Sequence, residues 1–173
     1  MRFSPGPVAA VFLVAMAACT LALDWRQAHL EGSGVAMLFP CRPDRHERAV
    51  QLAGVGLRMQ MHSCRAARAS FSLAYVDAAQ PAQVGPLLDE LRGRAVANIA
   101  GVGAVRPFAV PGATPNERSA QLRVEGRLPD GSEITEHAAF FVKGLRVYQA
   151  TALGKAVPAE AVETFFGAIK VVP

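Results

Sequence analysis

The sequence predicts an α+β domain, in which two main helices pack on an antiparallel β-sheet. Apolar and polar residues alternate in 57–62, 71–75 and 120–125, which is typical of half-buried strands. The apolar spacing changes to that of one helical face in 84–99 and again in 162–169. Each of these elements has one apolar face to bury, so helices lying on a sheet are expected.

The first half of the domain reads as successive strands. Residues 35–39 form an apolar run that Pro40 stops, and 47–52 form a short second run. The alternating segments 57–62 and 71–75 follow after turns. We therefore expect an antiparallel meander over residues 35–76.

The first helix follows this meander. Its apolar stripe begins after Pro81, but a proline is tolerated only in the first turn of a helix, so Pro86 predicts a start near that residue. The glycines of Gly101-Val102-Gly103 are expected to end it.

Strands resume in the second half. Residues 105–110 are a weak strand interrupted by Pro107, and Pro129-Asp130-Gly131-Ser132 predicts a hairpin turn between 120–125 and 134–142. A last long strand begins at Leu145. Pro158 is expected in the first turn of the closing helix, with a short tail behind it.

The composition is that of a globular protein. The chain has 173 residues, of which 51 % are hydrophobic and 18 % charged, with a formal net charge of +4. This small excess is scattered rather than gathered in a basic run, and aromatic residues make up only 7 %. We therefore expect no nucleic-acid partner.

Residues 1–23 resemble a targeting segment. Arg2 supplies a positive start, residues 8–23 carry no charge, and small residues follow the apolar run, as in a secretory signal. The sixteen uncharged residues fall short of the roughly 20 that span a bilayer. We expect a signal peptide or membrane-anchor helix at 1–23, followed by a single domain at 24–173.

Ala15-Met16-Ala17-Ala18-Cys19 resembles the lipobox of bacterial lipoproteins, in which small residues precede a cysteine that receives lipid. Met16 departs from the pattern, since leucine is commonest there. The resemblance implies lipidation at Cys19 and attachment to a membrane. A cleaved signal without lipid, an uncleaved anchor and a buried core helix are the alternatives.

The chain has two further cysteines, Cys41 and Cys64. If Cys19 carries lipid, these two form an even pair in an oxidising compartment, and we expect a Cys41–Cys64 disulfide. Two buried free thiols, or a metal site completed by His62 and His46, are the alternatives.

No motif in the sequence indicates catalysis. The chain lacks a G-x-S-x-G elbow and an H-E-x-x-H zinc motif, and its four histidines stand apart. Cys64 lies near His62, but no third group to orient the histidine is identifiable. We therefore expect a non-enzymatic protein with no catalytic residue, metal or cofactor; His137 is the weak alternative as a metal ligand.

Five arginines form the notable charge cluster. If the hairpins bring their loops together, a basic rim would lie near the two cysteines and contact anionic lipid headgroups or an acidic partner. Ordinary solvated loops are the alternative. The rim comprises Arg42, Arg45, Arg48, Arg65 and Arg68.

The apolar strand 35–39 continues into Phe39-Pro40-x-x-Pro43, and strands and helices then alternate. This pattern resembles the α/β/α sandwich of the PsbP-like proteins. Together with residues 108–115 and the 128–131 hairpin, it is more similar to small exported proteins of proteobacteria, uncharacterised lipoproteins or membrane proteins. The resemblance implies a fold and a place in the envelope but no reaction.

Three functions remain as hypotheses. The first is a non-enzymatic bacterial envelope lipoprotein, tethered to a membrane and facing the periplasm, that binds or scaffolds another envelope component, with an envelope protein as the possible partner. The second is a small-molecule or lipid-binding module with a pocket between sheet and helix. The third is an enzyme of a class that the sequence does not reveal.

Overall fold

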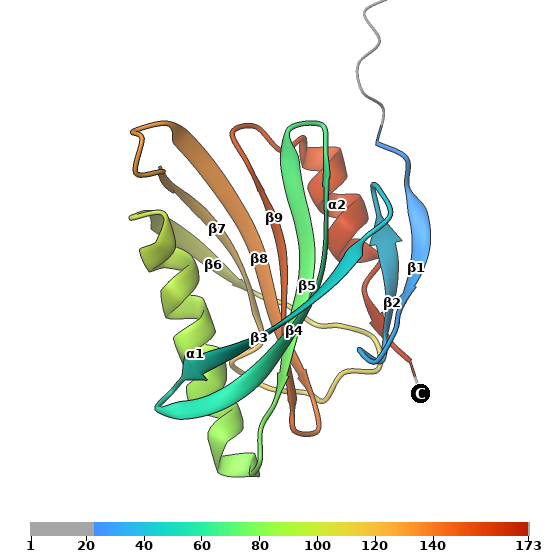
Figure 1. The fold of residues 1–173 in the computed structure, drawn as a ribbon, viewed down its shortest axis with the longest axis vertical. Helices are drawn as coiled ribbons and strands as arrows, with labels where there is room; N and C mark the ends of the chain where they lie inside the picture. Colours follow the sequence, from blue (N-terminus) through green and yellow to red (C-terminus); the bar gives the residue numbers. More distant parts are fainter. Residues whose placement is uncertain (1–22, 173) are drawn as a thin grey trace, which may run out of the picture.

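The computed structural model describes residues 23–172, which form ten strands and two helices (Figure 1). Their bounds, in chain order, are β1 Arg26–Leu30, β2 Val35–Phe39, β3 Asp44–Leu52, β4 Val55–Ala66, β5 Ala69–Asp77, α1 Pro81–Asn98, β6 Val102–Pro107, β7 Ala120–Arg127, β8 Glu133–Lys143, β9 Arg146–Gly154, α2 Ala159–Gly167 and β10 Lys170–Val171.

The strands form two antiparallel sheets. The large sheet has the order β3-β4-β5-β9-β8-β7-β6, and the small one has the order β1-β2-β10. The predicted α+β class is thereby confirmed. The single meander over 35–76 was wrong, because β2 pairs with β1 and β10 and only β3, β4 and β5 follow one another as a meander.

The two faces of the large sheet are covered differently. On one face lies α1, whose Leu87, Leu88 and Leu91 are buried in one apolar cluster with residues of the sheet. On the other lie α2 and the small sheet. There the ring of Phe165 in α2 contacts Phe71 of the large sheet edge-on at 5.2 Å, between ring centroids. The large sheet therefore buries apolar side chains on both of its faces, in two separate hydrophobic cores.

The first helix starts earlier than Pro86. Pro81 is its first residue, and the Gln83 side-chain oxygen caps its start by accepting hydrogen bonds from the N–H groups of Ala79 and Gln80, at 2.9 and 3.3 Å. Pro86 lies inside the helix, where it lacks the N–H that would bond to the preceding turn. The predicted start near Pro86 was wrong because the capping residues and Pro81 define a start one turn earlier.

The prediction that Gly101-Val102-Gly103 ends the first helix is also wrong in part. The helix ends before Gly101, and Val102 and Gly103 already belong to β6. The N–H of Arg127 donates to the carbonyl of Ile99 at 2.8 Å, so the end of α1 docks on β7. A Cβ on Gly126 would lie 2.1 Å from that carbonyl oxygen, which only glycine avoids.

The termini of the domain meet in the small sheet. The tail expected after the closing helix is β10, which pairs with β2. The predicted segment 1–23, with Cys19, lies outside the described residues except for Leu23. Between residues 23 and 172, neither helix combines the length and the apolar character that crossing a bilayer requires.

Candidate functional site

One open surface of the described chain is the part of the large sheet that α2 leaves uncovered. A hollow of about 890 Å3 lies there, walled by β7, β8 and the segment that leads into α2. A second hollow of about 410 Å3 shares Arg123, His137 and Ala159 with the first and continues toward β6. We call this continuous surface the α2-side groove.

Strand periodicity places the polar side chains of the groove. In β7, Leu122 and Val124 belong to the core beneath α1, so their neighbours Gln121, Arg123 and Glu125 project from the opposite face. In β8, His137 lies opposite Arg123 in the register. The same alternation that buries one face of these strands thus lines the groove on the other.

Most charges of the groove are internally balanced. Arg123 forms an ion pair with Glu125, and Arg127 pairs with Glu133 at 2.9 Å. Arg106 donates two hydrogen bonds, of 2.7 and 3.1 Å, to the Gln121 side-chain oxygen. The groove therefore presents hydrogen-bond donors and acceptors rather than a strong net charge of one sign. Such a surface suits a polar ligand or the backbone of a peptide.

His137 is half-buried in this wall. Burial lowers its pKa, and the nearby Arg123 and Arg106 lower it further. The imidazole is therefore neutral at neutral pH, with one donor and one acceptor nitrogen. This is a hydrogen-bonding side chain rather than a cation.

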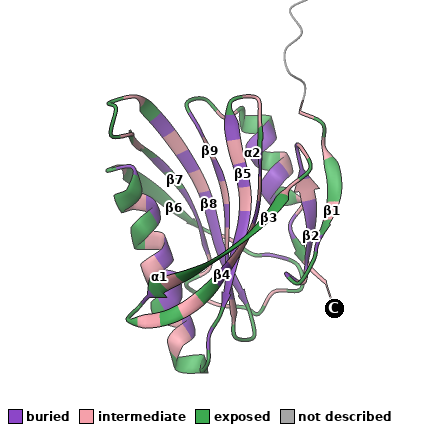
Figure 2. Cartoon of the chain, viewed as in Figure 1, coloured by how far each residue is buried: buried purple, intermediate pink, exposed green. Residues whose placement is uncertain are grey.

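Strand β6 forms the outer border of the groove and one edge of the large sheet. All six of its residues are exposed (Figure 2). Val102 is 85 % exposed and Val105 61 %, more than any other large hydrophobic residue that the structure describes. An apolar edge strand with unpaired backbone groups is a surface that proteins usually protect.

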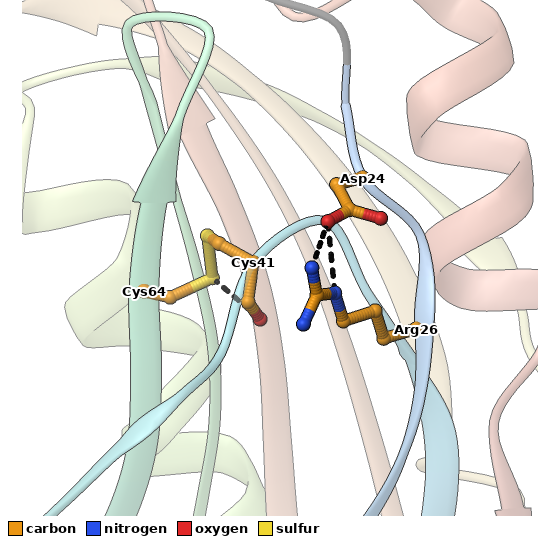
Figure 3. The surroundings of a disulfide bond; sticks show 4 residues. All are labelled: Asp24, Arg26, Cys41 and Cys64. Carbon is orange, nitrogen blue, oxygen red and sulfur yellow. Dashed lines mark hydrogen bonds and ion pairs between the residues drawn. A yellow bond between two sulfur atoms is a disulfide. The ribbon is translucent and has the colours of Figure 1, made fainter.

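The predicted disulfide is present: Cys41 and Cys64 are bonded, with their Cα atoms 6.0 Å apart (Figure 3). Cys41 follows β2 of the small sheet and Cys64 lies in β4 of the large one, so the bond joins the two sheets. A bonded cysteine is neither a nucleophile nor a thiolate ligand, which removes the alternatives of a catalytic Cys64 and a Cys41–Cys64 metal site. Among residues 23–172, no three His, Cys, Asp or Glu side chains gather as a metal site would need.

The five predicted rim arginines do not form one surface. Arg45 faces the small sheet and donates to Gln60 at 2.8 Å, whereas Arg48 lies on the α1 side of β3 beside Met59. The other three lie around the disulfide. These are Arg42, Arg65 and Arg68, all exposed.

A polar cluster that the sequence analysis missed fixes the small sheet on the large one. The Arg146 guanidinium holds both carboxylate oxygens of Asp77, at 2.6 and 2.8 Å, and donates to the Gly32 carbonyl at 2.6 Å. The Tyr148 hydroxyl, whose pKa burial raises, donates to the Ser33 carbonyl at 2.7 Å. A buried tyrosine in a strand needs a partner for its hydroxyl group, and this is the sequence signal that could have predicted such a contact.

Two further titratable side chains are buried. His62 is 4 % exposed, its pKa is lowered chiefly by burial, and its Nε2 finds no hydrogen-bond partner in the described part of the chain. Glu136 is 5 % exposed, and burial raises its pKa to about 7. Glu136 and His137 are neighbours on β8 and face opposite sides of the sheet, so Glu136 is not part of the groove.

Comparison with known proteins gives no family for this chain. It matches no protein-family model, and no curated protein is significantly similar to it.

Proposed function

We propose that this chain is a non-enzymatic bacterial envelope lipoprotein that binds another envelope protein through the α2-side groove and strand β6. The observation that supports partner binding is the exposure of Val102 and Val105 on β6, an edge strand that pairs only with β7 and lies next to a polar groove. The leader, with Cys19, supports the lipoprotein half.

The finer description of the fold is also a proposal. The Phe39-Pro40 motif and the order of strands and helices support a PsbP-like sandwich, with the large sheet between α1 and the layer of α2 and the small sheet. Resemblance to the small exported proteins of proteobacteria implies an envelope location but no reaction.

Strand addition is the binding mode that this surface favours. An extended segment of the partner would hydrogen-bond to the free backbone groups of β6 and place alternate side chains in the groove. The donors and acceptors of Arg106, Arg123 and His137 would meet its polar groups. Strand addition requires a free sheet edge, and in the large sheet only β3 and β6 have one. Of these two, β6 borders the groove and carries the exposed Val102 and Val105.

The binding half predicts a site-specific cross-link. A photo-reactive residue in place of Val102, in the full chain expressed in its host, is expected to yield a discrete protein adduct. Ala49 is the matched control, because it is exposed on β3, the other edge of the same sheet. The adducts would be read by immunoblot and mass spectrometry. Equal adducts from both positions, or no protein adduct from Val102, would contradict partner binding at β6.

The lipoprotein half predicts a lipid-dependent attachment. Cys19→Ala is expected to move the chain from the membrane to the soluble fraction, because the modified thiol is lost. Wild-type protein is expected to show the mass of a diacylglyceryl group on its Cys19 N-terminus. Continued membrane retention of Cys19→Ala would instead favour an uncleaved anchor.

A small-molecule or lipid ligand is the second candidate. The hollow of about 890 Å3 favours it, since ligand sites commonly fall in the range of about 300–1,000 Å3. Native mass spectrometry of the protein purified from its host distinguishes the two, because a retained small molecule appears as a defined added mass without any cross-linked protein.

A further inference from the structure

Most arginines of the described chain are neutralised by a neighbouring acid. Nine of them form an ion pair with Asp or Glu. Between residues 23 and 172, the arginines outside these pairs are Arg42, Arg48, Arg65, Arg68 and Arg106. The unpaired arginine charge of the described chain is therefore confined to these five positions.

Three of these unpaired arginines lie at one end of the molecule. The Cys41–Cys64 bond places Arg42 next to the last residues of β4, and Arg65 and Arg68 belong to the hairpin that joins β4 to β5. All three side chains are exposed. We call Arg42, Arg65 and Arg68 the basic end. Asp44, the acid nearest to Arg42 in the sequence, pairs with none of them in the described chain.

The N-terminal segment joins the domain at this same end. The N–H of Asp24 donates to the carbonyl of Pro40, next to the disulfide, at 3.2 Å. Trp25 contacts Phe71 of β5 edge-on, with ring centroids 6.1 Å apart, and Phe71 lies opposite Cys64 in the register. Figure 3 shows Asp24 and Arg26 beside the disulfide. The point at which residues 1–22 join the described chain therefore lies beside the basic end.

We propose that the basic end docks on the anionic lipid headgroups of the membrane that holds the N-terminus. This inference rests on the proposed lipid attachment, which would place Cys19 five residues before Asp24. The tether holds Arg42, Arg65 and Arg68 near the surface, where each cation strengthens binding about fivefold. The domain then stands with this end on the membrane, in one orientation.

Arginine footprinting measures this contact residue by residue. The full chain is reconstituted in vesicles of phosphatidylcholine alone, or with phosphatidylglycerol added at about one part in four. Phenylglyoxal modification of each arginine is then followed by mass spectrometry. We expect modification of Arg65 and Arg68 to slow about fivefold or more in the anionic vesicles. Arg58, 77 % exposed and at the other end of β4, should be unchanged.

Two variants of equal charge test the assignment. Arg42→Gln with Arg65→Gln is expected to abolish the protection of Arg68, whereas Arg48→Gln with Arg58→Gln should leave it intact. NaCl at about 0.5 M, where screening acts within about 4 Å, should also remove the protection. Protection that is equal in neutral and anionic vesicles, or that survives the first pair of substitutions, would overturn the proposal.

Flotation of the same vesicles separates this proposal from the lipid attachment. A chain that floats with neutral vesicles but shows no added protection in anionic ones keeps its tether and refutes the docking. A chain that floats only with anionic vesicles, and only with Arg42 and Arg65 in place, supports the docking and refutes the tether. A chain that floats with neither refutes both.

Discussion

Replacing Cys41 and Cys64 together by alanine is expected to lower the free energy of unfolding by about 3 kcal/mol. The bond closes a loop across a sequence separation of 23 residues, and the freed unfolded chain gains the entropy that this closure removes. The loop contains β3 and most of β4, and its closure holds the small sheet against the large one. Urea unfolding of oxidised wild type and the double variant measures the difference.

Reduction supplies the control for this prediction. A thiol reductant should lower the stability of the wild type to that of the double variant and leave the variant itself unchanged. A variant that loses less than about 1 kcal/mol would show that packing of the two sheets, rather than the covalent link, determines their association.

The disulfide was predictable because the cysteine count and the expected leader limited the alternatives, not because the sequence showed the two positions in contact. The alternation around Met59 and Leu73 likewise predicted strands that the structure contains. Which strands pair with one another was harder to predict from the sequence. Residues 35–39 read equally well as the first strand of a meander or as part of a second sheet, since a short apolar run carries no information about its partner.

The candidate site was harder to foresee than the fold. His137 and Arg123 are polar residues in alternating strands, and this pattern predicts exposure on a sheet face without saying whether a helix covers that face. Coverage depends on where α2 packs, which the sequence of β7 and β8 does not encode. The five arginines do not form one rim for a related reason. Arg45 and Arg48 are three residues apart in one strand, so they project from opposite faces of the sheet.

In the proposed function, the molecule has two separate surfaces: the N-terminal attachment at the basic end, and the groove with β6 at one edge of the large sheet. The disulfide and the polar cluster around Arg146 hold the small sheet rigidly on the large one. That rigidity fixes the N-terminal attachment relative to β6. A partner that binds at β6 would consequently meet the groove at a set orientation to the membrane, which a flexibly linked domain could not ensure.

Glu136→Gln is expected to raise the free energy of unfolding by about 2–3 kcal/mol at pH 8 and to have little effect at pH 4. Burial raises the pKa of Glu136 from 4.5 to about 7, and no other cause offsets it. The folded carboxyl therefore keeps its proton in a pH range where the unfolded one releases it. The stability that this group contributes is complete below about pH 4.5 and is lost as the pH rises through about 7.

Glutamine reproduces the protonated carboxyl at every pH, so the variant should lack this loss. Urea unfolding between pH 4 and pH 8 measures it, and Glu133→Gln, at an exposed position of the same strand, should follow the wild type. An equal change for Glu136→Gln at both pH values would mean that folding does not raise the pKa of this carboxyl. Because Glu136 faces α1 and not the groove, the cross-link expected from Val102 should persist in this variant, which separates a stability effect from a binding effect.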